Sequence, residues 1–356
     1  MKSIPIIQLG LGGVGRELAR QLLARRDAIA ERYGVSLNYL GLVDSAGVLN
    51  TGAILSPEAV LAAVEAKAQG RSLLEQGGRA RTGSAASLRG PTPVIAVDVS
   101  AASGHEVLLA DAVRFGNRVV LANKQPLAAA YSQFLTLTEH GATRYEATVG
   151  AGLPVISTLQ ALLDSGDSLT RVEAAMSGTL GYLCAELEAG RPLSAALRDA
   201  HALGYTEPDP RDDLSGRDVA RKALILARTC GLAWELDAIP AEPWFPPALA
   251  AVGRDEFMGR LEELDAPFAE RVAEARATGG ALRYVASVGP EGASVGLQML
   301  PAAHPLAGLR GPDNLFSFTT ARYAERPLVV RGPGAGLAVT AAGVLADIVA
   351  TARELV

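Results

Sequence analysis

The chain has 356 residues, of which 49% are hydrophobic and 20% charged, a length that exceeds what one hydrophobic core usually organises and so predicts two domains. Its formal net charge is −5, and acidic and basic residues are interleaved without a basic stripe, which argues against a nucleic-acid partner. Two cysteines, no export signal and no apolar run of about 18 residues predict a cytoplasmic protein that does not enter a membrane.

The first part of the chain alternates apolar runs with segments of helical spacing. Residues 4–9 are apolar and lead into glycines, and residues 16–32 then carry Leu18, Leu22 and Ile29 on one side of a helix. Residues 56–89 look like a helix followed by a mobile surface loop. Further apolar runs lie at 37–44, 93–98 and 118–123, with helical segments between them. Continuous apolar strands that alternate with helices predict a parallel sheet covered on both faces.

After about residue 150 the pattern changes to that of an α+β domain with a mostly antiparallel sheet. Helices are expected at 153–164, 193–203 and 216–230, and strands at 169–176, 281–288, 293–300, 314–320 and 327–331. The proline-rich segment 239–247 reads as a surface connection, and the C-terminal apolar helix is expected to return to the first domain. We therefore predict one domain from 1–150 plus 333–356 and a second from 151–332.

The glycine-rich segment Gly10-Leu11-Gly12-Gly13-Val14-Gly15 follows the first strand and opens the first helix. This placement matches the dinucleotide-binding fingerprint of a Rossmann-type α/β domain. Gly10 would permit the tight turn, Gly12 the approach of a pyrophosphate and Gly15 close packing of helix on strand. The helix N-terminus offers free N–H groups to the phosphates. The alternative is a glycine turn that binds nothing.

Asp44 ends the second predicted strand. A carboxylate there would accept hydrogen bonds from the adenosine ribose and repel a 2′-phosphate, which favours NAD over NADP. The alternative role for Asp44 is that of a capping aspartate at a turn.

Lysine is rare in this chain: only four of the 33 basic residues are lysines. Arginine cannot give up its proton near neutral pH, whereas lysine can, so the few lysines are candidates for proton chemistry. Lys2 and Lys67 fit solvated faces. Lys124 and Lys222 lie in segments that suit a reaction site.

Several familiar catalytic sites are excluded. The chain has no Tyr-x-x-x-Lys pair, and Cys184 and Cys230 are too few for a disulfide framework or a thiolate zinc site. The four histidines are scattered, and we expect them at the surface or as helix caps. They are His105, His140, His201 and His304.

The segment from Gly204 to Lys222 is the densest cluster of charge. Two prolines stiffen a loop that carries several carboxylates, among them Glu207 and Asp213, and these could clamp the ammonium of an amino-acid substrate. In the helix that follows, Asp218 and Lys222 are four residues apart and share one face. The alternative is a solvated helix with an ordinary ion pair.

Three further features lie at predicted strand ends and at the domain boundary. Lys124 follows the fourth strand and Ser100 the third, at the carboxyl ends where ligands bind in an open parallel sheet. Residues 146–153 form a glycine-rich turn whose carbonyls could cradle a cation or substrate, or which serves only as a hinge.

At this point the chain resembles the homoserine dehydrogenase family over nearly its whole length. The matching pieces are GLGGVG, ANKQPLA, YEATVGAGLPVI, SGTLGYL, GYTEPDPRDDLSGRDVARK and GPGAGLAVTAAGVLADI. The resemblance implies a Rossmann domain completed by the C-terminal helix, and a substrate domain that pairs with that of a partner in a homodimer. Val99 departs from the family, which often has a polar residue there. We expect no aspartokinase fusion and no regulatory module after Val356, and hence no threonine feedback through one.

The resemblance also assigns residues to roles. It places catalysis on Lys222, Asp218 and Lys124, and substrate binding on Glu207, Asp213, Thr179 and Tyr205. It places a monovalent cation, Na⁺ or K⁺, on Glu146 and the carbonyls of Val149, Ala151 and Leu153. The residues expected to bind the cofactor are Gly10, Gly12, Gly13, Val14, Gly15, Asp44, Ser100, Lys124 and Gly334.

We therefore expect an NAD(P)-dependent oxidoreductase that interconverts L-homoserine and L-aspartate 4-semialdehyde, on the route to threonine, methionine and isoleucine. Lys222, Lys124 or a bound water would carry the proton. One rival is an aspartate-semialdehyde dehydrogenase, which needs a thiolate nucleophile. Another is a non-catalytic NAD-binding sensor.

Overall fold

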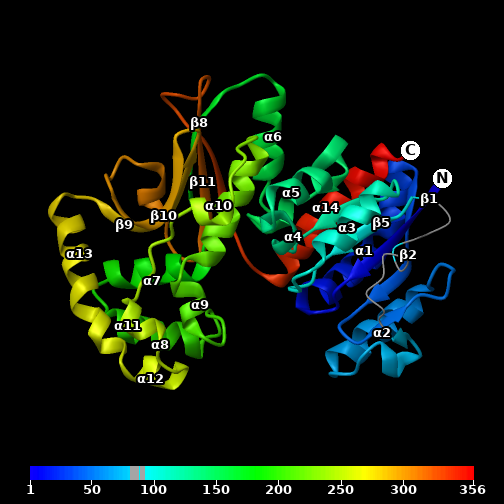
Figure 1. The fold of residues 1–356 in the computed structure, drawn as a ribbon, viewed down its shortest axis with the longest axis horizontal. Helices are drawn as coiled ribbons and strands as arrows, with labels where there is room; N and C mark the ends of the chain where they lie inside the picture. The colour runs from blue at the N-terminus through cyan, green and yellow to red at the C-terminus, as the bar shows by residue number, and fades with distance from the viewer. Residues whose placement is uncertain (81–87, 89–92) are drawn as a thin grey trace. The chain divides into compact units, whose positions relative to one another are not determined.

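A computed structural model describes residues 1–80, 88 and 93–356, which form two compact units (Figure 1). The first unit consists of Met1–Gly152 and Gly336–Val356, and the second of Leu153–Ala335. No helix in these described ranges combines the length and apolar character that crossing a bilayer requires.

The first unit is built on a seven-stranded, mostly parallel sheet in the order β4-β3-β2-β1-β5-β6-β7. The central strand β1 pairs in parallel with β2 and β5, and only β3 and β4 run antiparallel to their neighbours. This confirms the predicted α/β class. The strands are β1 (Lys2–Leu9), β2 (Val35–Val43), β3 (Gly47–Leu49), β4 (Arg79–Ala80), β5 (Ile95–Asp98), β6 (Arg118–Leu121) and β7 (Thr143–Arg144).

Each helix of this unit buries one of its sides against the sheet or against a neighbouring helix. Helix α14 packs along α1, and both contribute to a core with Ile4, Ile6 and Val97 of the central strands. Helices α3, α4 and α5 contact one another in a second group. The helices are α1 (Gly13–Tyr33), α2 (Pro57–Ala68), α3 (Glu106–Arg114), α4 (Gln125–Ala128), α5 (Tyr131–Thr138) and α14 (Leu337–Glu354).

The segment after α2 differs in part from the expected mobile loop. Leu73 is buried, a 3₁₀ turn follows at Leu74–Gln76, and β4 pairs with β3. Leu73 donates its N–H to the Asp44 carboxylate, which holds the segment against the sheet. The rest of the predicted loop lies outside the described residues.

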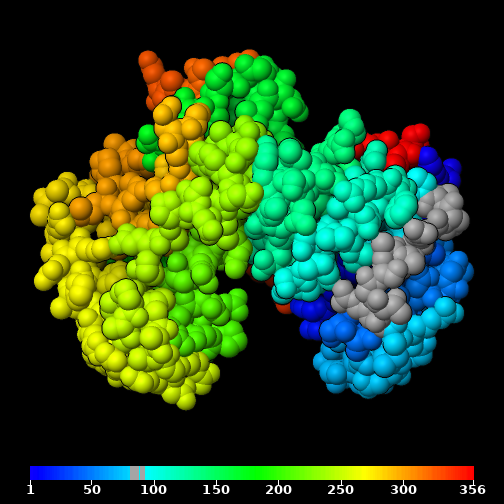
Figure 2. Space-filling view, in the orientation of Figure 1, coloured from blue at the N-terminus to red at the C-terminus, as the bar shows by residue number. Residues whose placement is uncertain are grey.

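The second unit contains a five-stranded antiparallel sheet in the order β10-β9-β8-β11-β12, as the alternating pattern predicted. Helices α6 and α10 lie side by side, and α10 contacts β9 and β10 (Figure 1). The yellow segment that contains α12 and α13 covers one side of this unit (Figure 2). The strands are β8 (Leu169–Ala175), β9 (Ala281–Gly289), β10 (Gly292–Leu300), β11 (Asp313–Thr320) and β12 (Leu328–Pro333). The helices are α6 (Ile156–Asp164), α7 (Gly178–Glu188), α8 (Leu193–Ala202), α9 (Pro210–Leu214), α10 (Arg217–Thr229), α11 (Pro247–Ala250), α12 (Arg254–Gly259) and α13 (Asp265–Ala277).

The proline-rich segment 239–247 is more than a surface connection, so that expectation was partly wrong. Trp244 is 3% exposed and packs against Phe268 with ring centres 4.8 Å apart and the ring planes tilted by 37°. Its backbone N–H donates to the carbonyl of Leu214 over 2.9 Å. Burial of an indole removes a large apolar area from water. The prolines of the segment suggested a surface connection and gave no indication of this burial.

A buried hydrogen-bond chain shapes the glycine turn between β1 and α1. The Tyr39 hydroxyl donates to Gln8 Oε1 over 2.7 Å, and Gln8 Nε2 donates to the carbonyls of Gly10 and Gly15. A Cβ atom on Gly15 would lie 2.2 Å from the Gly10 carbonyl oxygen, so helix and strand approach too closely for any side chain. Gly12 has open space where its Cβ would be.

These two glycines should therefore respond differently to alanine. We expect Gly15→Ala to lower the free energy of unfolding by about 1–3 kcal/mol, the usual cost of forcing atoms into a packed site. Gly12→Ala is the matched control and should leave it unchanged. Urea unfolding followed by circular dichroism measures both, and equal stabilities would contradict the packing argument.

Candidate active site

The acidic loop of the second unit folds onto the N-terminus of α7. The Thr179 hydroxyl lies 2.7 Å from the carbonyl oxygen of Tyr205 and 3.0 Å from Asp213 Oδ1, and it can donate its proton to one of them at a time. The Glu207 N–H donates to Asp213 Oδ2 over 2.8 Å. All four predicted substrate residues are thus brought together, with the Glu207 side chain exposed and Asp213 within the short helix α9.

The surroundings of Asp213 disfavour the charged form of its carboxylate. Burial raises its pKa, and the nearby Glu207 and Asp218 carboxylates raise it further, while the Glu207 N–H and the Thr179 hydroxyl oppose the shift. A bound ammonium would remove this repulsion between carboxylates. The arrangement therefore suits a cationic amino group.

Lys222 lies on α10 and reaches back to the same end of α7. Its Nζ donates to the carbonyl of Met176 over 2.7 Å and lies 3.1 Å from Asp218 Oδ2. The lysine side chain is 12% exposed and that of Asp218 is 44% exposed. The predicted pairing at i,i+4 is present, and the contact with Met176, which the sequence did not indicate, fixes where the ammonium points.

The glycine turn of the first unit leaves the N-terminus of α1 open for an anion. Helix α1 has 21 residues, no side chain caps its first N–H groups, and no acidic residue lies in its first turn. Gly12 is exposed, Gly13 and Val14 are half-buried, and Gly10 adopts φ +100°. Free N–H groups and the helix dipole are the features by which such turns bind phosphate.

Asp44 is more constrained than a free ribose ligand would be. Its side chain is 2% exposed, and Oδ1 accepts hydrogen bonds from the N–H groups of Ala46 and Gly47. Oδ2 accepts from the Leu73 N–H over 3.0 Å and from Lys67 Nζ over 2.8 Å. Burial raises the pKa of Asp44, but these hydrogen bonds outweigh it and leave the pKa below its ordinary value. The turn-capping role is thus present in the structure.

The expectation that Lys67 stands on a solvated face is wrong. Its side chain is 23% exposed and its ammonium is paired with Asp44. Its partner lies 23 residues away in the sequence, so no local pattern indicated the pair.

A buried carboxylate that the sequence did not single out organises the ends of β5 and β6. Asp98 is fully buried, and its Oδ1 accepts from the N–H and the hydroxyl of Ser100. Its Oδ2 lies 2.9 Å from His105 Nδ1 and accepts from Asn123 Nδ2 over 3.0 Å. Asn123 immediately precedes the half-buried Lys124, so one carboxylate positions the segments of both candidate residues. The sequence signal that could have identified this arrangement was the presence of two polar residues, Asp98 and Asn123, at the ends of neighbouring strands.

The histidines follow the expectation only in part. His140 is exposed and His304 caps a 3₁₀ turn by accepting from the Leu306 N–H. His201 is half-buried, beside Thr206. His105 is 4% exposed and paired with Asp98, so it is neither a surface residue nor one whose side chain caps its helix.

The predicted cation turn combines a carboxylate with buried backbone. Val149 and Ala151 are buried, and Ala151 adopts φ +56°, an uncommon value for a residue other than glycine. The Glu146 N–H donates to Asp347 Oδ2 over 2.9 Å, and burial with the neighbouring Glu146 carboxylate raises the pKa of Asp347 to about 7. Leu153 begins the second unit. Carboxylate and carbonyl oxygens fit a hard cation. The described residues hold no cluster of three His, Cys, Asp or Glu that could bind a metal.

Gly334, also assigned to the cofactor, lies in the second unit just after β12. A Cβ atom there would be 1.8 Å from Asn314 Nδ2, so the position admits only glycine without rearrangement.

Comparison with known proteins points to one family. The family model described as homoserine dehydrogenase matches residues 154–349. A homoserine dehydrogenase of Emericella nidulans is 42% identical over 276 residues, which cover 72% of this chain and 74% of that protein. The bifunctional aspartokinase/homoserine dehydrogenase 2 of Zea mays is 39% identical over 98% of this chain. The chain spans 38% of the maize protein.

The fold agrees with the sequence comparison. A hyperthermophilic archaeal homoserine dehydrogenase solved in complex with NADPH superposes with a TM-score of 0.75 and 26% identity, covering 99% of this chain and 98% of that one. Because the family model matches more than half of the chain and relatives of this similarity cover most of it, the chain belongs to the homoserine dehydrogenase family.

Proposed function

We propose that this protein interconverts L-homoserine and L-aspartate 4-semialdehyde with NAD or NADP, on the route to threonine, methionine and isoleucine. The observation that carries the proposal is the group of carboxylates around Asp213, with Lys222 held by Met176 and Asp218. Few reactions need several carboxylates together with one fixed ammonium. A substrate that fits this group is an amino acid that carries an aldehyde, because the carboxylates can bind its amino group and the ammonium can face its carbonyl oxygen. The family and the NADPH complex of the archaeal relative support the choice of cofactor.

Each residue has a distinct part in this proposal. Glu207 and Asp213 bind the substrate ammonium, and the Thr179 hydroxyl and the Glu207 N–H hold Asp213 in place. A bound nicotinamide supplies or accepts the hydride. Lys222 donates a hydrogen bond to the carbonyl oxygen on which charge develops, and Asp218 orients it. Lys124 or an ordered water is the alternative donor of the proton.

We further propose a cytoplasmic homodimer with a Na⁺ or K⁺ ion at the turn from Glu146 to Leu153. The geometry of the turn supports the cation: the Glu146 N–H donates to the buried Asp347 carboxylate, and a positive charge there would offset two neighbouring carboxylates. The ion would be held by Glu146 and by the carbonyls of Val149, Ala151 and Leu153.

The rival reading as a thiolate enzyme has little support. Burial raises the pKa of both cysteine thiols, Cys184 and Cys230, to about 12, so neither is a ready nucleophile. Incubating the purified protein with homoserine and NAD, with absorbance read at the NADH band, separates the proposed enzyme from an NAD-binding sensor. Formation of neither NADH from NAD nor NADPH from NADP would overturn the proposal.

Cofactor preference offers a first test. We propose that the Asp44 carboxylate favours NAD, and that the paired Lys67 ammonium reduces its repulsion of a 2′-phosphate. Lys67→Met should then raise the ratio of kcat/KM for NAD to that for NADP by about three- to tenfold. Asp44→Asn should lower the ratio. If Lys67→Met leaves the ratio unchanged while the melting temperature falls, the pair serves only the fold.

Substrate binding is tested by Glu207→Gln, which keeps the size of the side chain and removes its charge. We expect KM for homoserine to rise about tenfold, because a charge-assisted contact with the ammonium is lost, while KM for NAD stays constant. Glu291→Gln removes an exposed charge elsewhere and is the control. An unchanged KM for homoserine would assign Glu207 a structural role.

Proton chemistry is tested by Lys222→Arg, which keeps the positive charge but removes a proton that can dissociate. Turnover should fall by about two to four powers of ten, with cofactor affinity and melting temperature little changed. Lys2→Arg is the control, since Lys2 is exposed and bonds only to the carbonyl of Leu355 in the described structure. Near-native turnover would leave Lys124 or a water as the better proton donor.

A further inference from the structure

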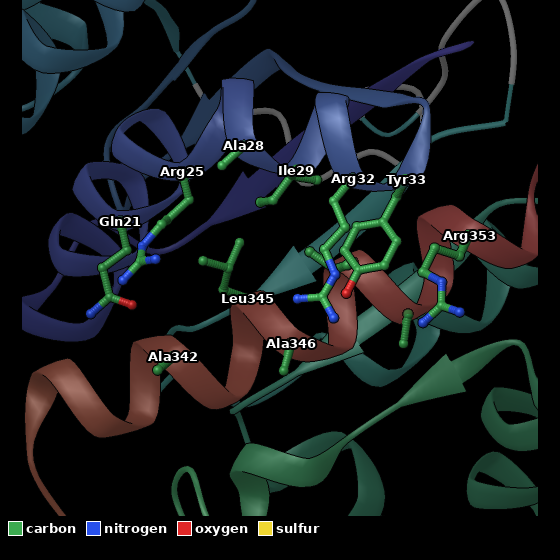
Figure 3. A pocket seen from close by; sticks show the side chains of 12 residues that line it. Gln21, Arg25, Ala28, Ile29, Arg32, Tyr33, Ala342, Leu345, Ala346 and Arg353 are labelled. Carbon is green, nitrogen blue, oxygen red and sulfur yellow. The ribbon is translucent and has the colours of Figure 1, made fainter. Parts of the chain in front are cut away.

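A basic furrow runs between α1 and α14 in the first unit, apart from every residue assigned to the reaction. The two helices run in the same direction, because Gln21 in the first half of α1 bonds to the Ala338 carbonyl near the start of α14, and Arg353 stacks on Tyr33 near the end of both. The furrow has a volume of about 730 Å³ (Figure 3). On α1 it extends from Gln21 to Tyr33, which corresponds to about 18 Å of helix.

The charge of the furrow differs from that of the chain as a whole. Arg25, Arg32 and Arg353 line it and no acidic residue does, although the chain carries a net charge of −5. Among the described residues these three guanidinium groups make no ion pair. Arg26, which does not line the furrow, is paired with Asp27 on the same helix. The furrow therefore presents positive charge that no ion pair offsets within the part of the chain that the structure describes.

Two of the arginines are held in place by an aromatic ring. The guanidinium carbon of Arg353 lies 4.8 Å from the centre of the Tyr33 ring, and that of Arg32 lies 5.1 Å from it. Figure 3 shows these three side chains toward one end of the furrow and Arg25 with Gln21 toward the other. Stacking lowers the entropy that each guanidinium loses when it pairs with a carboxylate.

The walls between the arginines are small and apolar. Ala342 and Ala346 are exposed on α14, Ala350 is half-buried one turn later, and Leu345 and Val349 lie beside them. Alanine at successive turns allows another backbone to approach closely. A long furrow with such walls fits an extended partner better than a compact metabolite.

We propose that this furrow docks an acidic amphipathic helix of a partner protein. Arg25 and Arg32 are seven residues apart, which is two turns or about 10 Å along α1. A helix lying in the furrow has the same rise, so carboxylates seven residues apart on it come opposite both arginines. Its apolar stripe then covers the alanines, and Arg353 pairs with a further carboxylate at one end.

The test uses the full chain and a fluorescent peptide of about 15 residues, with leucine and alanine along one face and two glutamates seven residues apart. Fluorescence anisotropy should show saturable binding that weakens as salt is raised, because the contacts are exposed charges. A peptide with glutamine for both glutamates should bind about tenfold more weakly. A peptide with a central proline, which cannot form the helix, should not bind.

Charge reversal on the protein completes the test. The double variant Arg25→Glu with Arg32→Glu should raise Kd for the acidic peptide about tenfold and should bind a peptide with lysines in place of the glutamates. Arg26→Glu, on the same helix but outside the furrow, should leave both affinities unchanged, and the dehydrogenase assay checks that each variant is folded. Absence of binding to the acidic peptide at about 1 mM, or an equal loss in Arg26→Glu, would overturn the proposal. Equal binding of free glutamate or inorganic phosphate would overturn it in favour of a simple anion site.

Discussion

The buried carboxylate of Asp98 holds together the part of the first unit where a ligand would meet the sheet. Four hydrogen bonds from three segments end on its two oxygens, so the loop after β5, the start of α3 and the end of β6 cannot move independently. A buried charge of this kind is tolerated only when donors satisfy it fully. The same loop lies so close to Gly10 that a Cβ atom there would be 2.8 Å from the Ser100 nitrogen.

In the second unit, contacts with neighbouring segments likewise hold the acidic loop in place. Its acidic loop carries too many like charges to pack by itself, and it is held by backbone contacts with α7 and by Trp244, whose N–H bonds to Leu214 at the end of α9. Lys222 bonds to Met176, three residues before Thr179. Lys222 and the Asp213 carboxylate therefore both contact the same short segment of the chain. Anchoring charged side chains through backbone leaves the carboxylates available for a substrate.

Charge is distributed unevenly between lysine and arginine in a way that the structure explains. Two of the four lysines, Lys67 and Lys222, are mostly buried and aim a compact ammonium at a carboxylate. Arginine pairs with carboxylates both at the surface and in the interior, where Arg228 and Arg283 are buried, and in the furrow along α14 its planar group stacks on Tyr33. The residue type thus follows the geometry that each contact requires.

The sequence by itself determined the class of both units, because strand and helix periods, glycine turns and the acidic motif are local patterns that neighbouring residues specify. Helical spacing also predicted the pairing of Asp218 with Lys222, and the family resemblance placed Thr179, Tyr205, Glu207 and Asp213 in one group. Only the tertiary structure decided the partners that are distant along the chain: Lys67 on Asp44, His105 and Asn123 on Asp98, Lys222 on Met176, and Trp244 in the core. Such contacts depend on the order of the strands in the sheet and on how the loops fold over them. No local pattern of residues specifies which residues far apart in the sequence will meet.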